Sequence, residues 1–82
     1  MSVRILFFAS AREAAGCHHF SLPCTKDGWC EAEFWARLVQ EFPALKALQS
    51  SARLARNQDY LAPDDRIFPG DEVAVIPPVS GG

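Results

Sequence analysis

The residues of this chain that are best suited to chemistry are its last six, Pro77-Pro78-Val79-Ser80-Gly81-Gly82. Two prolines favour a stiff, extended backbone without N–H donors. The last two residues have no side chain, so the α-carboxylate of Gly82 can enter a slot too narrow for any Cβ. Such a carboxylate suits a reaction inside another protein. A frayed terminus or a linker remnant is the alternative, and these residues alone do not decide between the two.

A second group that could do chemistry combines thiols and imidazoles: Cys17, His18, His19, Cys24 and Cys30. The group lacks the paired CxxC spacing of common zinc sites, and adjacent histidines on a strand point to opposite faces. A cysteine–histidine nucleophile pair would also lack an orienting third group. No glycine-rich phosphate loop is present. We therefore expect no metal and no self-contained active site.

Composition limits the classes of protein that remain. The chain has 82 residues, 49% hydrophobic and 22% charged, with a net charge of −2, as in one small globular domain. Without a basic cluster we expect no nucleic-acid partner. No apolar run approaches the ~20 residues that span a bilayer, so we expect no membrane partner. Three cysteines without a secretion signal favour reduced thiols and the cytosol.

Two strongly apolar strands and one long helix are expected to position the tail. Residues 3–9 are apolar on both faces, as in a central strand, and residues 72–76 form a second strand that leads into the tail. Asp27 is the expected N-cap of a helix from about residue 29 to residue 42. Its apolar stripe is typical of a helix packed on a sheet.

Shorter elements complete the expected order. Residues 10–16 predict a short helix with Ser10 as N-cap and Gly16 at its C-terminal end. Residues 18–22 predict an edge strand before Pro23. One or two helical turns follow at 44–50, then short strands at 53–57 and 60–61.

This order predicts an α+β fold of the β-grasp type, a mixed sheet with one long helix across one face. The first and last strands would be adjacent and parallel, because the helix supplies the crossover. Residues 1–76 would form the domain and residues 77–82 the extended tail. Leu6, Phe8 and Ile76 would then emerge on the uncovered face as an apolar partner-binding patch, unless loops or the second short helix cover them.

Three segments of the chain resemble a known family. The run from Pro69 to Gly82 (Pro-Gly-Asp-Glu-Val-Ala-Val-Ile-Pro-Pro-Val-Ser-Gly-Gly) resembles the end of the small subunit of molybdopterin synthase, the MoaD-type sulfur carrier. Residues 5–16 are similar to the family's opening strand and short helix, and residues 55–58 to its third strand and turn. Residues 24–30 and 49–53 match no pattern of the family.

The resemblance implies a ubiquitin-like β-grasp fold and a particular chemistry. An E1-like, MoeB-type enzyme would adenylate Gly82 with ATP, and a persulfide would supply the sulfur of a C-terminal thiocarboxylate. The tail would then enter a MoaE-type large subunit and transfer sulfur to cyclic pyranopterin monophosphate. Two loaded carriers per dithiolene imply a heterotetramer. The chain would bind no permanent cofactor and would not be catalytic alone. A thiamine-type sulfur carrier and a ubiquitin-like modifier conjugated to lysines are the alternatives.

Overall fold

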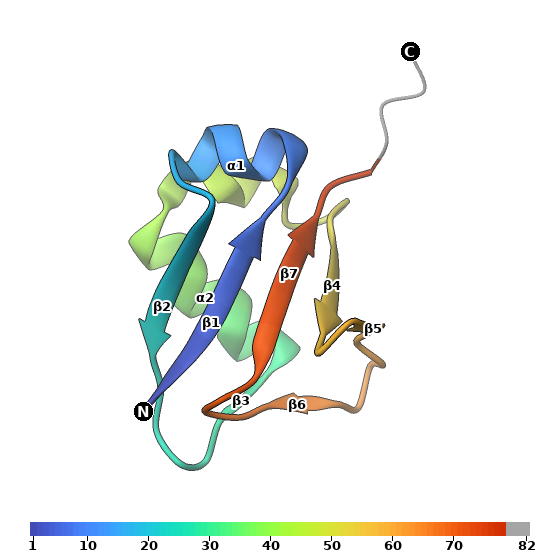
Figure 1. The fold of residues 1–82 in the computed structure, drawn as a ribbon. Coiled ribbons are helices and arrows are strands. Elements are labelled where there is room, and N and C mark those ends of the chain that lie inside the picture. The colour runs from blue at the N-terminus through green and yellow to red at the C-terminus, as the bar shows by residue number, and fades with distance from the viewer. Residues whose placement is uncertain (79–82) are drawn as a thin grey trace.

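A five-stranded sheet with one long helix across one face forms the body of the protein (Figure 1). The computed structural model describes residues 1–78. The elements in chain order are β1 (Ser2–Phe7), α1 (Ala9–Ala15), β2 (His19–Pro23), β3 (Trp29–Cys30), α2 (Glu31–Glu41), the 3₁₀ helix η1 (Pro43–Leu48), β4 (Arg53–Arg56), β5 (Asp59–Tyr60), β6 (Arg66–Ile67) and β7 (Glu72–Ile76).

The strand order is β2-β1-β7-β4-β5, with β3 and β6 in a separate two-stranded ribbon. β1 and β7 are central and parallel, with Ile5 opposite Val73 and Phe7 opposite Val75. β2 pairs antiparallel with β1, and β4 pairs antiparallel with β7. The predicted β-grasp arrangement, with its first and last strands adjacent, is therefore confirmed.

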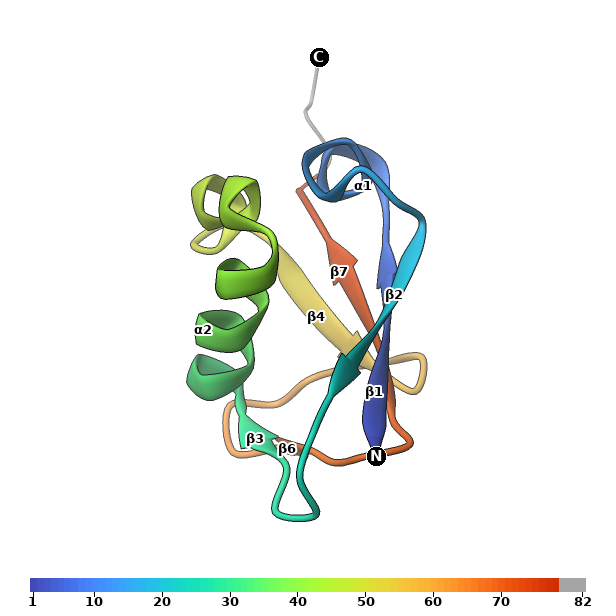
Figure 2. The same ribbon diagram turned by 90° about the vertical axis from the view of Figure 1, so that its left-hand side faces the viewer.

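The core lies between the sheet and α2 (Figure 2). Alternate residues of β1 and β7 point into it, and α2 packs Phe34, Trp35 and Leu38 against them; the strand residues are Val3, Ile5, Phe7, Val73 and Val75. Burial of each large apolar side chain in this way stabilises the folded state by about 1.5–3 kcal/mol. Within residues 1–78 no helix is both long enough and apolar enough to cross a membrane.

Both predicted helix N-caps are wrong. The N-cap of α1 is Phe8, not Ser10, because the Phe8 carbonyl already accepts the N–H groups of Ala11 and Arg12. The N-cap of α2 is Cys30, not Asp27: its sulfur accepts the Glu33 N–H, and the Glu33 carboxylate accepts the Cys30 N–H at 2.9 Å. Asp27 lies too early because β3 pairs with β6, so residues 29–30 are extended.

A tight hairpin joins β4 to β5 and fixes the direction of the residues that follow. Its two loop residues, Asn57 and Gln58, have φ of 51° and 76°, the left-handed conformation of a two-residue hairpin turn. The Asn57 amide accepts the Glu72 N–H at 3.0 Å and donates to Asp71 at 3.1 Å. The hairpin is therefore tied to the start of β7, and Tyr60 is placed opposite Ala55.

The left-handed backbone of Gln58 leads to a prediction for this hairpin. We expect Gln58→Gly to raise the free energy of unfolding by about 0.5–1 kcal/mol, because glycine adopts a positive φ without the steric cost that a Cβ carries. In a domain of this size the thermal midpoint would rise by roughly 2–8 °C. Gln58→Ala is the matched control and should give no gain. Equal midpoints for the two variants would contradict the turn geometry.

Candidate functional site

The tail leaves the domain from the central strand β7. Residue 76 ends the strand, Pro77 is buried and Pro78 is exposed. The boundary between domain and tail after residue 76 stays a prediction. The other predicted tail residues, Val79, Ser80, Gly81 and Gly82, lie outside the described residues, so their roles remain predictions.

A hollow of about 600 Å³ lies where the tail begins. It is lined by the start of α1, including Phe8 and Arg12, and by Ile76, Pro77 and Pro78 from the end of β7. Ala9 has φ of 49°, a left-handed conformation at the point where the chain passes from β1 into α1. This sharp change of direction leaves Phe8 beside the tail, with 48% of its surface exposed.

The sheet surface opposite α2 is here called the open face. Along β1 and β7, the apolar residues that alternate with the buried ones are Leu6, Ala74 and Ile76, all half-buried. Leu6 pairs with Ala74, Ala74 with Ala55, and Ala55 with Tyr60, so an apolar row crosses four strands. Figure 2 shows α2 and η1 on the other side of the sheet, and in residues 1–78 no helix lies over this row.

Sequence reasoning found part of this surface and missed part. The structure places the predicted residues Leu6, Phe8 and Ile76 at the same end of the sheet, where β1 and β7 finish side by side. It adds Ala74 and Tyr60, of which Tyr60 is 59% exposed. Tyr60 was missed because its face depends on the two-residue turn before it, and one residue more or less would reverse its direction.

Charged groups on the open face are few. The Arg4 guanidinium lies 3.8 Å from the Glu72 carboxylate, and both side chains are substantially exposed. Arg53, opposite Ile76 in the β4–β7 register, has its guanidinium carbon 4.3 Å from the centre of the Tyr60 ring. Both arginines border the apolar row, whose centre contains no charged residue.

The thiol–imidazole group does not form a site. All three cysteines are free. Among the described residues, no group of three or more His, Cys, Asp and Glu side chains could hold a metal ion. Burial raises the pKa of the Cys24 thiol, which disfavours a reactive thiolate. The Cys30 N–H bound to Glu33 lowers the pKa of that carboxyl, which belongs to the α2 cap. Neither group lies on the open face.

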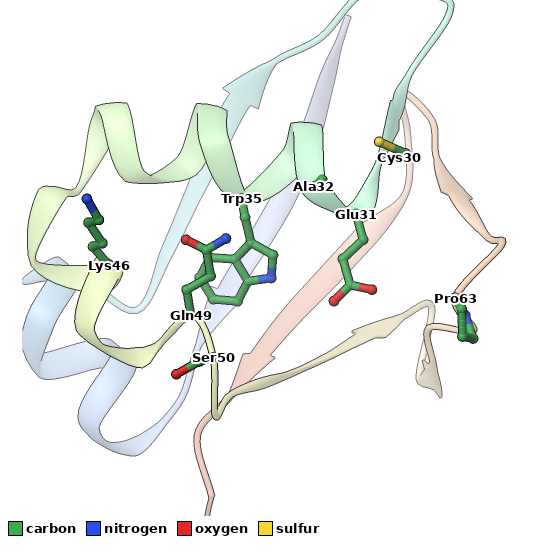
Figure 3. A pocket seen from close by; sticks show the side chains of 8 residues that line it. All are labelled: Cys30, Glu31, Ala32, Trp35, Lys46, Gln49, Ser50 and Pro63. Atoms are coloured by element: carbon green, nitrogen blue, oxygen red, sulfur yellow. The ribbon is translucent and has the colours of Figure 1, made fainter.

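A second hollow, of about 670 Å³, lies away from the open face, between α2, η1 and the loop before β6 (Figure 3). Trp35 lies between Glu31 and Lys46 in this view, and Cys30 and Pro63 border the far end. Trp35 itself is 2% exposed and belongs to the core. We therefore interpret this hollow as a consequence of packing α2 on η1.

Together, the central parallel strand pair, the crossing helix and the apolar open face define a ubiquitin-like β-grasp protein. A model of the ThiS family matches residues 5–82, and the chain belongs to this family.

Curated relatives are similar in sequence to this chain over its whole length, or nearly so. The chain is 37% identical to a molybdopterin synthase sulfur carrier subunit from Chlamydomonas reinhardtii, and the match covers all of both chains. It is 34% identical to the subunit of that name from Arabidopsis thaliana, covering all of this chain and 84% of the relative. The human subunit of that name is 30% identical, and the match covers 98% of this chain and 93% of the human protein.

Solved structures share the fold. SAMP1 from Haloferax volcanii superposes with a TM-score of 0.83 at 28% identity, covering all of both chains. A complex of subunits 1 and 2 of the molybdopterin-converting factor from Helicobacter pylori contains a chain with a TM-score of 0.68 at 24% identity, again covering all of both chains. At that identity the second likeness concerns the fold alone.

Two neighbouring phenylalanines test the division between core and open face. We expect Phe7→Asp to leave the chain largely unfolded, because Phe7 is 3% exposed and an unpaired carboxylate in the core costs several kcal/mol. Phe8→Asp should change the free energy of unfolding by less than about 1 kcal/mol, since aspartate is a favourable N-cap for α1. Circular dichroism during urea unfolding measures both. Similar losses for the two variants would contradict the assignment of faces.

Proposed function

We propose that this chain is the sulfur-carrier subunit of a molybdopterin synthase. The observation that carries the proposal is the agreement over the full length, tail included, with curated sulfur carrier subunits at 30–37% identity. The sequence Pro77-Pro78-Val79-Ser80-Gly81-Gly82 supports it, because the reacting group would be the carboxylate of the last glycine.

The chemistry would begin with activation of that carboxylate. A carboxylate is a poor acyl donor, and an E1-like, MoeB-type enzyme would use ATP to join Gly82 to AMP, releasing pyrophosphate. The terminal sulfur of a persulfide would then displace AMP, and a thiol would cleave the sulfur–sulfur bond to leave a thiocarboxylate. In the large subunit this group would transfer its sulfur to cyclic pyranopterin monophosphate. Two loaded carriers would complete one dithiolene, which favours a heterotetramer of two small and two large subunits.

The chain would contribute the reacting atom and its delivery. Pro77 and Pro78 restrict the backbone before the tail enters its channel, so less conformational freedom is lost on binding. Gly81 and Gly82 would let the tail pass through a narrow passage. The catalytic pocket would belong to the large subunit, a MoaE-type protein.

The large subunit would dock on the open face. Phe8, Leu6 and Ile76 lie at the end of β1 and β7, beside the root of the tail. A surface that binds there would hold the tail at a fixed distance from its own pocket. The Helicobacter pylori complex of subunits 1 and 2 of the molybdopterin-converting factor supports a two-subunit assembly, because one of its chains has this fold.

Conjugation to other proteins is the second candidate function. It is favoured by the 28% identity and TM-score of 0.83 with SAMP1, whose name is small archaeal modifier protein 1. A thiamine-type sulfur carrier is a further alternative, favoured by the ThiS family match. For any of these, three free cysteines support a reducing compartment, and we place the protein in the cytosol.

The position of the terminal carbonyl provides a direct test of sulfur transfer. Deleting Gly82, or adding one residue after it, should abolish transfer while leaving the fold intact, because the carbonyl moves by roughly 3.3–3.6 Å. Intact mass after incubation with ATP, an activating enzyme and a sulfur donor should show one oxygen-to-sulfur exchange on the natural chain. Circular dichroism provides the folding control. Transfer by either altered chain would exclude the mechanism, and isopeptide adducts on other proteins would favour the modifier.

Docking on the open face is tested separately. We expect Phe8→Asp to weaken binding to the large subunit by at least about tenfold, because it places a charge in the apolar contact. Phe8→Leu is the matched control and should bind within a few-fold of the natural chain. Isothermal titration calorimetry with the purified large subunit measures both. If Phe8→Asp binds as the natural chain does, the large subunit docks elsewhere.

A further inference from the structure

We propose that Arg53, held against the ring of Tyr60, is a recognition residue of the open face that binds a carboxylate of the partner protein. The proposal rests on the proposed function, in which the large subunit docks on this face. It adds that the partner must present a carboxylate, and that Arg53 on β4 is the residue that binds it.

The position of Arg53 is set by strand pairing. Arg53 is opposite Ile76, and Tyr60 is opposite Ala55, two residues further along β4. Arg53 and Tyr60 are therefore diagonal neighbours on one face of the β4–β5 hairpin. The guanidinium lies 4.3 Å from the ring centre, within the range of a cation–π contact. Held in this way, the arginine loses less side-chain freedom when it binds a partner.

The charge of Arg53 is not balanced on its own surface. Of the five other arginines, Arg4, Arg37, Arg56 and Arg66 each have a carboxylate oxygen within 4.0 Å, and within residues 1–78 Arg12, on α1, does not. Within residues 1–78, Arg53 has no acidic side chain at that distance. It is thus an uncompensated cation beside an apolar row, in a chain whose net charge is −2.

Docking makes this imbalance important. A partner that covers Leu6, Ala74 and Ile76 also removes water from the neighbouring guanidinium. An arginine buried without a partner charge is strongly unfavourable, so a matching surface must supply an anion. The planar guanidinium can form two parallel hydrogen bonds with a carboxylate, which makes a carboxylate the anion that suits it best.

The surroundings favour a protein over a nucleic acid. Apolar side chains, an exposed tyrosine and few charged residues are the composition of the centre of a protein interface. A polyphosphate backbone would require several cations, and Arg4, the other arginine on this face, is paired with Glu72. We therefore infer that the large subunit carries an aspartate or glutamate opposite Arg53.

Binding of the purified large subunit to charge variants tests this inference. Arg53→Glu should weaken binding by at least about 30-fold, because the new carboxylate would face the partner's own. Arg53→Met keeps the unbranched stem but not the charge, and should weaken binding by about tenfold. Lys46→Glu makes the same change of charge on η1, away from the open face, and should bind within about twofold of the natural chain.

Salt dependence and a double-mutant cycle distinguish recognition from structural support. Binding of the natural chain should weaken as salt is raised from 0.05 to about 0.5 M, and this dependence should diminish in Arg53→Met. If Tyr60 positions Arg53, adding Tyr60→Leu to the natural chain should weaken binding to the large subunit more than adding it to Arg53→Met does. The thermal midpoint of every variant is measured first, and Arg53→Met replaces Arg53→Glu if the latter unfolds.

Three outcomes would overturn the assignment of Arg53: binding by both Arg53 variants within twofold of the natural chain, an unchanged salt dependence in Arg53→Met, or an equal loss in Lys46→Glu. In each case the natural chain still binds, so the proposed function stands. A natural chain that does not bind the large subunit at any salt concentration would instead reject the docking proposal and this inference together.

Discussion

The parallel pairing of β1 with β7 is the constraint on which the rest of the structure depends. Adjacent parallel strands cannot be joined by a tight turn, so the intervening chain must cross the sheet, and α2 is that crossing. The crossing covers one face with Phe34, Trp35 and Leu38. Within residues 1–78 the other face has no helix over it, and that face is the surface on which the proposed partner would dock.

The same pairing connects the open face to the tail. β1 and β7 finish at the same end of the sheet, where β1 continues into Phe8 and β7 into Pro77. A partner that docks on the exposed phenylalanine therefore also meets the start of the tail. Under the proposed function, this geometry explains how the chain could take part in a reaction: it would position one reactive carboxylate.

Along each central strand, side chains point alternately into the core and onto the open face. Ile5 and Val73 are fully buried, whereas Leu6 and Ala74, one residue later, lie half-buried on the open face. Neighbouring residues thus have separate tasks, and the core does not depend on the side chains that would contact a partner. The exposed apolar atoms contribute little to folding and much to association, where their burial is favourable.

The sequence by itself determined the fold class and the parallel central pair, because alternation and a long apolar helical stripe are local patterns. It also placed Leu6, Phe8 and Ile76 outside the core, and their role in binding a partner stays a prediction. It did not place the caps of α1 and α2. Phe8 is held by its N–H bond to the Val75 carbonyl, and Cys30 by the pairing of β3 with β6, rather than by their own cap preference. Only the tertiary structure put Tyr60 and Arg53 on the open face. Arg53 is placed there by its pairing with Ile76 of β7. The direction of Tyr60 depends on a two-residue turn tied to β7 by contacts between residues distant in the chain.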